Sequence, residues 1–331
     1  QPAFSSLPLE LFLNVLDQLV GTPTSQRPIA LPPTHSTTRT LRALTLVSRD
    51  IYPIASRYLY THSLYLDTCQ RYTLFRRTLA LPLGNQHPLA LPYNTPTRNE
   101  PLFAAADLPR HITALFVSPQ KLLAAGAAPM VRLPQVIDLC ARVGSSLRRL
   151  ALDLQPVYSS YSEARAFKPH VADNQIFLGM PRLEELVCSY DTMDYFVLPP
   201  PRLKRLAVTS QGLNAVQQRF CFAVASLEVL VFIQGVDMEA AHIDMLFEAY
   251  HGRHLDVVMV ELEANHRCPV GMREWTDEDR VTVWEADVGY RSDEDDLLLC
   301  DNWIWANGVA GTLWGCEKRR KGASRESQMQ L

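Results

Sequence analysis

The residues of this 331-residue chain that could bind a metal ion gather in one short region. His251 and His254 precede an apolar run, and His266 and Cys268 follow it. A structural zinc site needs two closely spaced pairs of ligands that converge on one ion. The run between the pairs has the pattern of a strand, and a strand of about eight residues would hold its ends ~25 Å apart. We therefore expect no metal site and no cofactor.

Motifs of known catalytic sites are also missing. The sequence contains no GxSxG nucleophile elbow, phosphate-binding loop, HExxH pair or GxGxxG turn. Carboxylates are numerous, but no spacing rule selects two of them as an acid and a base. The expectation is a chain without catalytic residues of its own. A hydrolase that lacks any recognisable motif is the alternative, and activity screening would test it.

The composition is that of a globular protein with a sizeable core. Hydrophobic residues make up 47% and charged residues 20% of the chain, and the net charge of −3 gives no electrostatic reason to expect a nucleic-acid partner. Seven scattered cysteines without a CxxC pair indicate reduced thiols in a cytoplasmic or nuclear protein. The longest apolar stretch, residues 220–233, is too short to span a bilayer, so we expect no membrane partner.

The first sixty residues contain three apolar helical segments. Residues 7–20 predict one helix, and residues 41–60 predict two more, the last beginning near Ile51 with Asp50 as its N-cap. The first segment is apolar around most of its circumference, so nearly all of it needs burial. Three short helices cover too little of their own surface to provide that burial, which predicts a partner protein. Residues 21–40 hold four prolines and six threonines and predict a loop.

This N-terminal segment resembles the F-box, particularly as it occurs in fungal proteins. The resemblance is carried by Leu7-Pro8, the leucine run that follows, Val47-Ser48-Arg49, and the spacing of Ile51, Ile54 and Ala55. Two features depart from the family. Ile51 stands where Trp is most common, and about twenty residues separate the first two helices where a few are usual.

The resemblance implies docking on a Skp-type adaptor and, through it, on a cullin. By motif match, the residues expected to contact the adaptor are Leu7, Pro8, Leu11, Leu16, Leu44, Val47, Ile51 and Ile54.

Beyond a Pro-rich stretch at residues 81–109, one short apolar phrase recurs. Its copies are residues 111–117, 146–152, 182–188, 202–208, 226–232 and 254–260, and residues 64–66 form a partial seventh. The phrase resembles the strand of leucine-rich repeats in a degenerate form, without the characteristic Asn. An ordinary sheet of amphipathic strands is the alternative.

These patterns predict an α+β, solenoid-like fold, with a three-helix F-box followed by an irregular leucine-rich-repeat-like horseshoe. We divide the chain into a helical module (5–62, with the insert 21–40), a repeat domain (63–290, with the loop 81–109), a Trp-rich capping segment (291–316) and a disordered polar tail (317–331).

Alternation along the strands predicts which residues face away from the core. If Leu147, Leu150 and Leu152 point inward to the core, the residues between them line the opposite face, together with their counterparts on the next strands. The candidates for substrate binding on that face are Arg149, Asp153, Glu185 and Arg205. Alternatively, these charges pair across neighbouring strands. Residues 227–233 are apolar on both faces, and we expect Trp303 or Trp305 to pack over Val229, Val231 and Ile233.

The function that the resemblance implies is that of a substrate receptor in a cullin–RING ubiquitin ligase. The chain would hold an unknown protein substrate near the enzyme that carries ubiquitin and would itself make no bonds. The alternative is a leucine-rich-repeat binding scaffold outside any ligase, with the N-terminal helices as a cap.

Overall fold

The computed structural model shows a mixed α/β protein built around one largely parallel sheet. The residues that it describes are 8–21, 27–79, 106–118, 133–154, 175–211, 213, 215–234, 244–245, 247–248, 250–262, 273, 275, 278–289 and 296–320. The Pro-rich loop predicted at residues 81–109 lies almost entirely outside them, as do His266 and Cys268.

Among the described residues, helices and strands follow each other in the order expected for a repeating fold. The α-helices are α1 (Leu9–Val20), α2 (Ser36–Leu44), α3 (Ile51–His62), α4 (Cys69–Thr78), α6 (Leu108–His111), α7 (Leu133–Val143), α9 (Tyr190–Tyr195), α10 (Ala215–Phe222) and α12 (Asp296–Ala310), and the 3₁₀ helices are η2 (Ile176–Gly179) and η3 (Leu313–Gly315). The strands are β1 (Tyr65–Leu66), β2 (Ala114–Val117), β3 (Arg149–Leu152), β4 (Glu185–Ser189), β5 (Arg205–Gln211), β6 (Val229–Ile233), β7 (Leu255–Leu262), β8 (Val281–Val288) and β9 (Arg319–Arg320).

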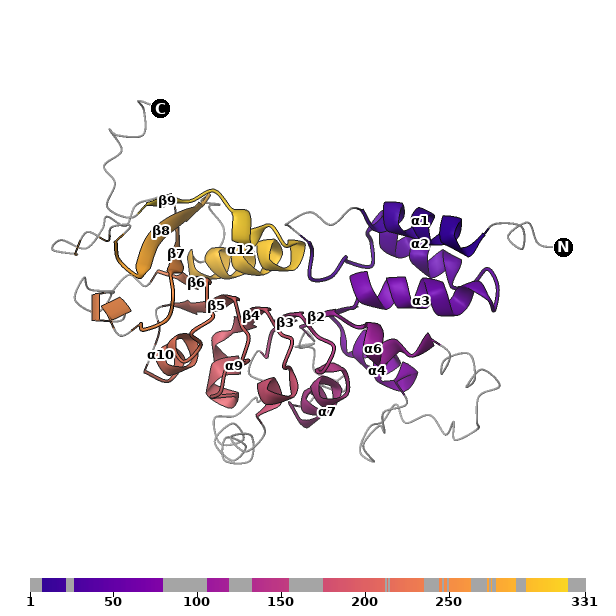
Figure 1. Ribbon diagram of the computed structural model, residues 1–331, viewed down its shortest axis with the longest axis horizontal. Coiled ribbons are helices and arrows are strands. Elements are labelled where there is room, and N and C mark those ends of the chain that lie inside the picture. Colours follow the sequence, from indigo (N-terminus) through magenta and orange to yellow (C-terminus); the bar gives the residue numbers. More distant parts are fainter. Residues whose placement is uncertain are drawn as a thin grey trace, which may run out of the picture.

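Each strand pairs with the next strand in the sequence. The order in the sheet is β1 to β9, and all pairs are parallel except β8 with β9. The helices α7, α9 and α10 lie on one face of the strand row, and α12 lies on the other (Figure 1). Every copy of the recurrent phrase, including the partial one, forms a strand as predicted. The sequence analysis missed β8 and β9.

The outer core is a ladder of equivalent leucines and valines. Parallel pairing in register places the same position of each phrase side by side, and these side chains point toward the outer helices. The ladder runs through Leu115, Leu150, Leu186, Leu206, Leu230, Val257 and Val283. All of these residues are buried, so the repeat phrase is a packing device that stacks one apolar row against the helices.

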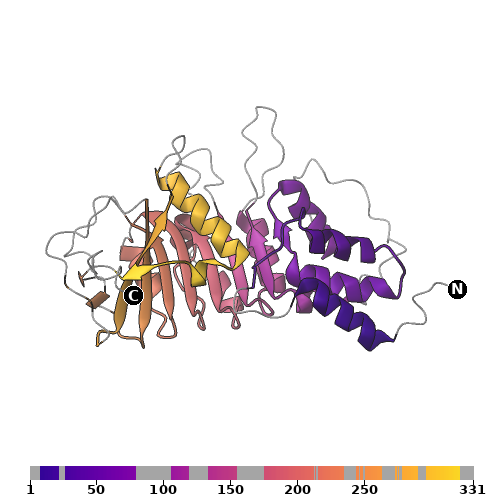
Figure 2. The same cartoon turned by 90° about the horizontal axis from the view of Figure 1, so that it is seen from above.

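The inner face of the sheet is also a core, contrary to our expectation that it would be open. Ala151, Val187 and Ala207 were predicted to line an exposed face, but all three are completely buried in an apolar cluster that includes Ile29 and residues of α12. Figure 2 shows α12 lying across the strands. Small side chains let the helix approach closely, and a Cβ on Gly308 would lie 2.9 Å from a methyl of Val187. The inner face therefore needs this helix for its own burial.

The Trp-rich segment covers the face that the sequence indicated. Trp303 and Trp305 belong to one apolar cluster with Val229, Val231 and Ile233, which confirms that the two regions pack together. Trp305 reaches as far as Phe116 of β2, with ring centroids 6.2 Å apart. Both indoles stay partly exposed, so each buries less apolar area than a ring enclosed in the core.

The prediction of a loop at residues 21–40 is wrong for its last five residues. Residues 36–40 begin α2, whose first turn is capped by His35, the side chain of which accepts a hydrogen bond from Thr37 N. Ile29 is completely buried in the inner-face cluster, and its backbone N–H donates to Val309 O at 2.8 Å. The insert thus joins the helical module to the sheet. Ile29 anchors this segment on the sheet, although the many prolines and threonines around it predicted a loop.

The start of α3 is as predicted, but its cap is not. Asp50 occupies the N-cap position of α3 without a side-chain capping bond. Ser48 Oγ accepts the hydrogen bond from Ile51 N instead, at 3.2 Å.

The polar tail was predicted to begin at residue 317, but the chain remains structured up to β9. Arg319 contacts three carboxylates of β7 and β8: its Nη2 lies 3.2 Å from Glu261, its Nε 2.9 Å from Glu285 and its Nη1 3.1 Å from Asp287. Because Glu261 is completely buried, its charge needs this cation. The basic residues of this segment therefore tie the chain across the last strands.

We predict that Gly308→Val destabilises the protein by ~1–3 kcal/mol, because the added methyls collide with Val187 and push α12 off the sheet. Ala306→Val is the matched control, since Ala306 is exposed on the same helix and gains the same kind of side chain without a collision. Urea denaturation of the two variants measures the difference. Equal stabilities would contradict close packing of α12.

Arg319→Met should cost ~3–5 kcal/mol, because it removes the cation from buried Glu261 and Glu285. Arg319→Lys keeps the charge but cannot reach all three carboxylates, so an intermediate loss is expected. Thermal unfolding of the three proteins gives the order. A wild-type melting temperature for Arg319→Met would show that the contacts contribute nothing.

Candidate protein-binding surfaces

The three N-terminal helices form a small core of their own. It consists of Phe12, Leu16, Leu41, Ile51 and Ala55. The hydroxyl of Tyr58 donates to Asp17 at 2.7 Å and ties α3 to α1. Burial and the neighbouring carboxylate raise the pKa of Tyr58 to about 12, so this donor keeps its proton at neutral pH.

Helix α1 presents a second apolar face to solvent. Phe12 and Leu16, four residues apart, point into the module, whereas Leu11 and Val15, also four apart, point outward. Val15 is 57% exposed. Helix α1 thus keeps apolar side chains exposed as well as buried, and the expectation that a partner protein covers them stays a prediction.

The turn between α2 and α3 adds further exposed apolar side chains. Leu46 is 86% exposed, and Val47 beside it is also exposed. The start of α1 and this turn lie at the same end of the helical module, the end away from the sheet (Figure 1). We call Leu11, Val15, Leu46 and Val47 the outer apolar set. Several solvent-exposed apolar side chains in so small a module are typical of a protein-interaction site.

The residues expected to contact an adaptor occupy different environments. Pro8, Leu11 and Val47 are exposed, Leu44 and Ile54 are half-buried, and Leu7 lies outside the described residues. Leu16 and Ile51 are buried in the core of the helical module, and adaptor contact through them stays a prediction. The sequence analysis missed Val15 and Leu46. The four-residue spacing from Leu11 was the available signal for Val15.

A cleft of about 410 Å³ separates α1 from α3 and α6. Leu9, Leu13 and Ile54 form its apolar part, while Arg57, His62 and His111 line the polar part. Burial and the neighbouring Arg149 and Arg27 lower the pKa of His62 to about 4, so its imidazole is neutral at physiological pH.

The predicted substrate residues on the inner face make contacts within the protein. Glu185 and Arg205 form an ion pair at 2.8 Å, as the alternative of cross-strand pairing predicted. Arg149 donates from Nη1 to the carbonyls of Arg27 and Pro28 at 2.9 and 2.7 Å. Asp153 accepts a hydrogen bond from Ser118 Oγ at 2.8 Å. The structure does not gather the four into one open site, and their role in substrate binding stays a prediction.

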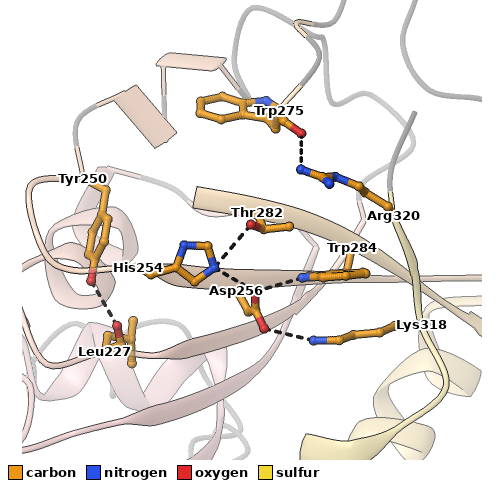
Figure 3. A network of polar contacts seen from close by, with 9 residues as sticks. All are labelled: Leu227, Tyr250, His254, Asp256, Trp275, Thr282, Trp284, Lys318 and Arg320. Atoms are coloured by element: carbon orange, nitrogen blue, oxygen red, sulfur yellow. Dashed lines mark hydrogen bonds and ion pairs between the residues drawn. The ribbon is translucent and has the colours of Figure 1, made fainter. Parts of the chain in front are cut away.

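A polar network around Asp256 joins the last strands to the segment before β9 (Figure 3). Trp284 Nε1 donates to Asp256 Oδ1 at 2.9 Å, and Lys318 Nζ lies 3.2 Å from Oδ2. Burial alone would raise the pKa of Asp256, but these hydrogen bonds and the charge of Lys318 hold it below its usual value. Asp256 is thus an ionised anchor for the C-terminal segment.

The same network includes His254 but not in the geometry of a catalytic relay. Its Nε2 lies 3.3 Å from both Asp256 Oδ1 and Thr282 Oγ1. A relay requires the orienting acid and the hydroxyl nucleophile on opposite ring nitrogens. Because both groups meet the same nitrogen here, His254 cannot pass a proton between them. The contacts instead fix the ends of neighbouring strands.

The candidate metal ligands do not come together within the described residues. His254 is engaged with Asp256, and His251 is exposed. The described part of the chain contains no group of three or more His, Cys, Asp or Glu residues placed to hold a metal ion.

Neither comparison with known proteins supplies a relative. No family model matches the sequence, and no curated protein matches it. None of the helices that the structure describes has both the length and the apolar composition needed to cross a membrane. Function must therefore be argued from the surfaces themselves.

The carboxyl group of Asp301 in α12 makes the stability of the protein depend on pH. Burial raises its pKa to about 6, and nearby Asp153 adds to the shift. A carboxyl whose folded pKa is raised favours the native state when protonated, so the stability it confers is lost as pH rises from ~4 through 6. Asp301→Asn should therefore be more stable than wild type at pH 7.5, by an amount of order 1 kcal/mol after allowance for partial exposure.

That advantage should shrink as pH falls from 6 toward 4, where the wild-type carboxyl is protonated as well. Urea midpoints measured at pH 4.5 and 7.5 for both proteins test the effect. An advantage that does not change with pH would mean that Asp301 titrates normally.

Proposed function

We propose that this protein is the substrate-receptor subunit of a cullin–RING ubiquitin ligase. The N-terminal helices would dock as an F-box on a Skp-type adaptor, which links the chain to a cullin. The sheet domain would hold a protein substrate within reach of the enzyme that carries ubiquitin. The protein itself contributes proximity, which raises the effective concentration of substrate lysines.

One observation carries the proposal. The segment with F-box-like sequence folds into three helices that share a core, and yet it keeps the outer apolar set exposed at the end away from the sheet. A module that served only to cap the sheet would gain nothing from apolar residues there. A docking module needs them, because desolvation of a few central apolar side chains supplies most of the binding energy of an interface.

The contacts between module and sheet support a fixed geometry between the two partners. Arg57 Nε donates to Ala106 O at 3.1 Å, and Thr61 Oγ1 donates to His111 O at 2.7 Å. Both bonds join α3 to the segment that leads into β2. A substrate held on the sheet would thus keep a defined orientation to an adaptor on the far side of the helices, which is what a positioning subunit requires.

The same contacts favour a second candidate function, that of a binding scaffold outside any ligase. In that case α3 closes the β1 end of the repeats, and the module is a cap. Binding to an adaptor distinguishes the two candidates.

We predict that Val15→Asp and Val47→Asp each weaken binding to a purified Skp-type adaptor by ~2–4 kcal/mol, which is roughly 30-fold to 1000-fold in Kd. Both side chains are exposed, so the fold should survive the change. Leu178→Asp is the matched control, because Leu178 of η2 is as exposed as Val15, at 57%, but lies in the sheet domain. Titration calorimetry gives the affinities, and circular dichroism verifies the helices.

A buried residue of the module serves as a comparison, because its substitution should act through unfolding and not through a lost contact. Leu16→Ala should lower stability by ~2–5 kcal/mol, because Leu16 is completely buried, so loss of adaptor binding in that variant would report unfolding. If wild-type protein binds no adaptor, or if the folded Val15→Asp and Val47→Asp proteins bind as well as Leu178→Asp, docking through the outer apolar set is wrong. The scaffold function would then be favoured.

A further inference from the structure

A row of exposed arginines runs along the edge of the sheet at which the parallel strands begin. Its members precede β3, β4, β5, β7 and β8, and all are exposed. We call them the arginine row: Arg148, Arg182, Arg202, Arg253 and Arg280. The strand register aligns three of them, because Glu185, Arg205, Val229 and Asp256 are successive partners, and Arg182, Arg202 and Arg253 each lie three residues before their own strand's member of that series. Arg148 lies one residue before Arg149 and Arg280 two residues before Thr282, which are the members of the series on β3 and β8.

The arginine row lacks neutralising partners among the residues that the structure describes. None of its five guanidinium groups makes an ion pair or a side-chain hydrogen bond there. The next positions along the same strands behave differently, because Lys204 pairs with Glu184 at 3.7 Å and Arg205 pairs with Glu185 at 2.8 Å. Cross-strand pairing thus neutralises the positions beside the row and leaves the row itself charged.

Arginines without an acidic partner repel one another when they precede neighbouring strands, and this repulsion lowers the stability of the sheet. Arg182 and Arg202 precede β4 and β5, which are adjacent in the sheet, and strands lie ~4.8 Å apart. Like charges on adjacent strands destabilise a sheet. The cost is confined to this edge in a protein whose net charge is −3, so it does not reflect a generally basic chain. An anionic partner would remove the repulsion.

We propose that the arginine row binds an acidic, extended peptide segment of the protein that the sheet domain holds. The three aligned arginines run from β4 to β7, which is three strand spacings or ~14 Å and matches about four residues of extended chain, and Arg148 and Arg280 stand on the next strand at either end. Guanidinium groups pair with carboxylates or phosphates in a bidentate manner, so either Asp/Glu or phosphorylated side chains could supply the charge. This inference rests on the proposed function for the identity of the partner as substrate, but binding itself does not require the adaptor.

Two acidic residues on the same edge favour a peptide over a nucleic acid. Glu184 and Glu228 stand between the arginines, immediately before β4 and β6. A uniform phosphate backbone would meet repulsion at both positions, whereas a peptide can place a neutral or basic residue there. The location also fits the covered inner face, because the strand-start edge stays accessible beside α12 and the outer helices.

Fluorescence polarisation with the full chain tests the inference without adaptor. The probes are nine-residue labelled peptides: one rich in Asp and Glu, one phosphoserine peptide of equal charge, and one neutral Ser/Gln peptide. We expect the two acidic probes to bind and the neutral probe not to bind. Arg182→Glu with Arg202→Glu should weaken acidic-peptide binding at least ~10-fold, since charge complementarity becomes repulsion.

The matched control is Arg39→Glu with Arg42→Glu, which makes the same change of net charge on two exposed arginines of α2 and should alter binding less than about twofold. Tighter binding of the phosphoserine probe would assign the charge to phosphate, and equal binding would assign it to charge alone.

Three results would overturn the inference: no binding of either acidic probe, equal losses in the two double variants, or a single-stranded oligonucleotide that binds more tightly than both peptides and is lost in the Arg182/Arg202 variant. Adaptor binding by these variants is measured in parallel, so a failure of the arginine row is distinguishable from a failure of the docking surface.

Discussion

A parallel sheet has two faces to bury, and this requirement organises the whole protein. The crossover helices α7, α9 and α10 lie on the outer side and cover that face of the sheet as the chain advances. Nothing in the repeating pattern covers the other face. Ala151, Val187 and Ala207 would be left in water, together with the second face of β6. The chain solves this with elements from its two ends: α12 lies over the strands, and the segment around Ile29 packs beside it.

Burial of the inner face limits where binding can occur. A curved sheet with a free inner face offers a broad surface for a partner, but here α12 occupies that face, with Gly308 against Val187. Two accessible features among the described residues are the outer apolar set on the N-terminal helices and the arginine row at the strand-start edge. One is apolar and the other is cationic, so the two would select partners of different chemistry.

The C-terminal segment has a structural role that its composition obscures. Lys318 and Arg319 look like members of a solvated basic run, yet Lys318 contacts Asp256 and Arg319 contacts Glu261, Glu285 and Asp287. These carboxylates sit on β7 and β8, the last parallel strands. Their attraction for the basic residues adds β9 to an edge that would otherwise expose unpaired backbone groups.

The sequence by itself determined the local elements and their periodicity. The recurrent apolar phrase predicted seven strands, and the helical segments near residues 7–20 and 41–60 are helices, because alternation and helical spacing are properties of neighbouring residues. The packing of the Trp-rich segment on Val231 and Ile233 was also predictable, since each was too apolar to stay in water. Of the residues predicted to contact an adaptor, Leu11 and Val47 are exposed and Leu16 is buried, because a motif does not distinguish residues that fold a module from residues that face out of it.

Tertiary structure alone decided which surfaces remain free. Ile29 lies in a stretch rich in proline and threonine, and only the closeness of Val309 in space shows that it is anchored. The inner face around Ala151 was predicted to be exposed but is buried, because the apolar cluster that includes α12 and Ile29 extends over more strands than the apolar pattern of residues 227–233 indicated. The pairing of Glu185 with Arg205 and the isolation of Arg182 and Arg202 likewise follow from strand register. Register and long-range packing depend on the whole chain, and no short window of sequence contains them.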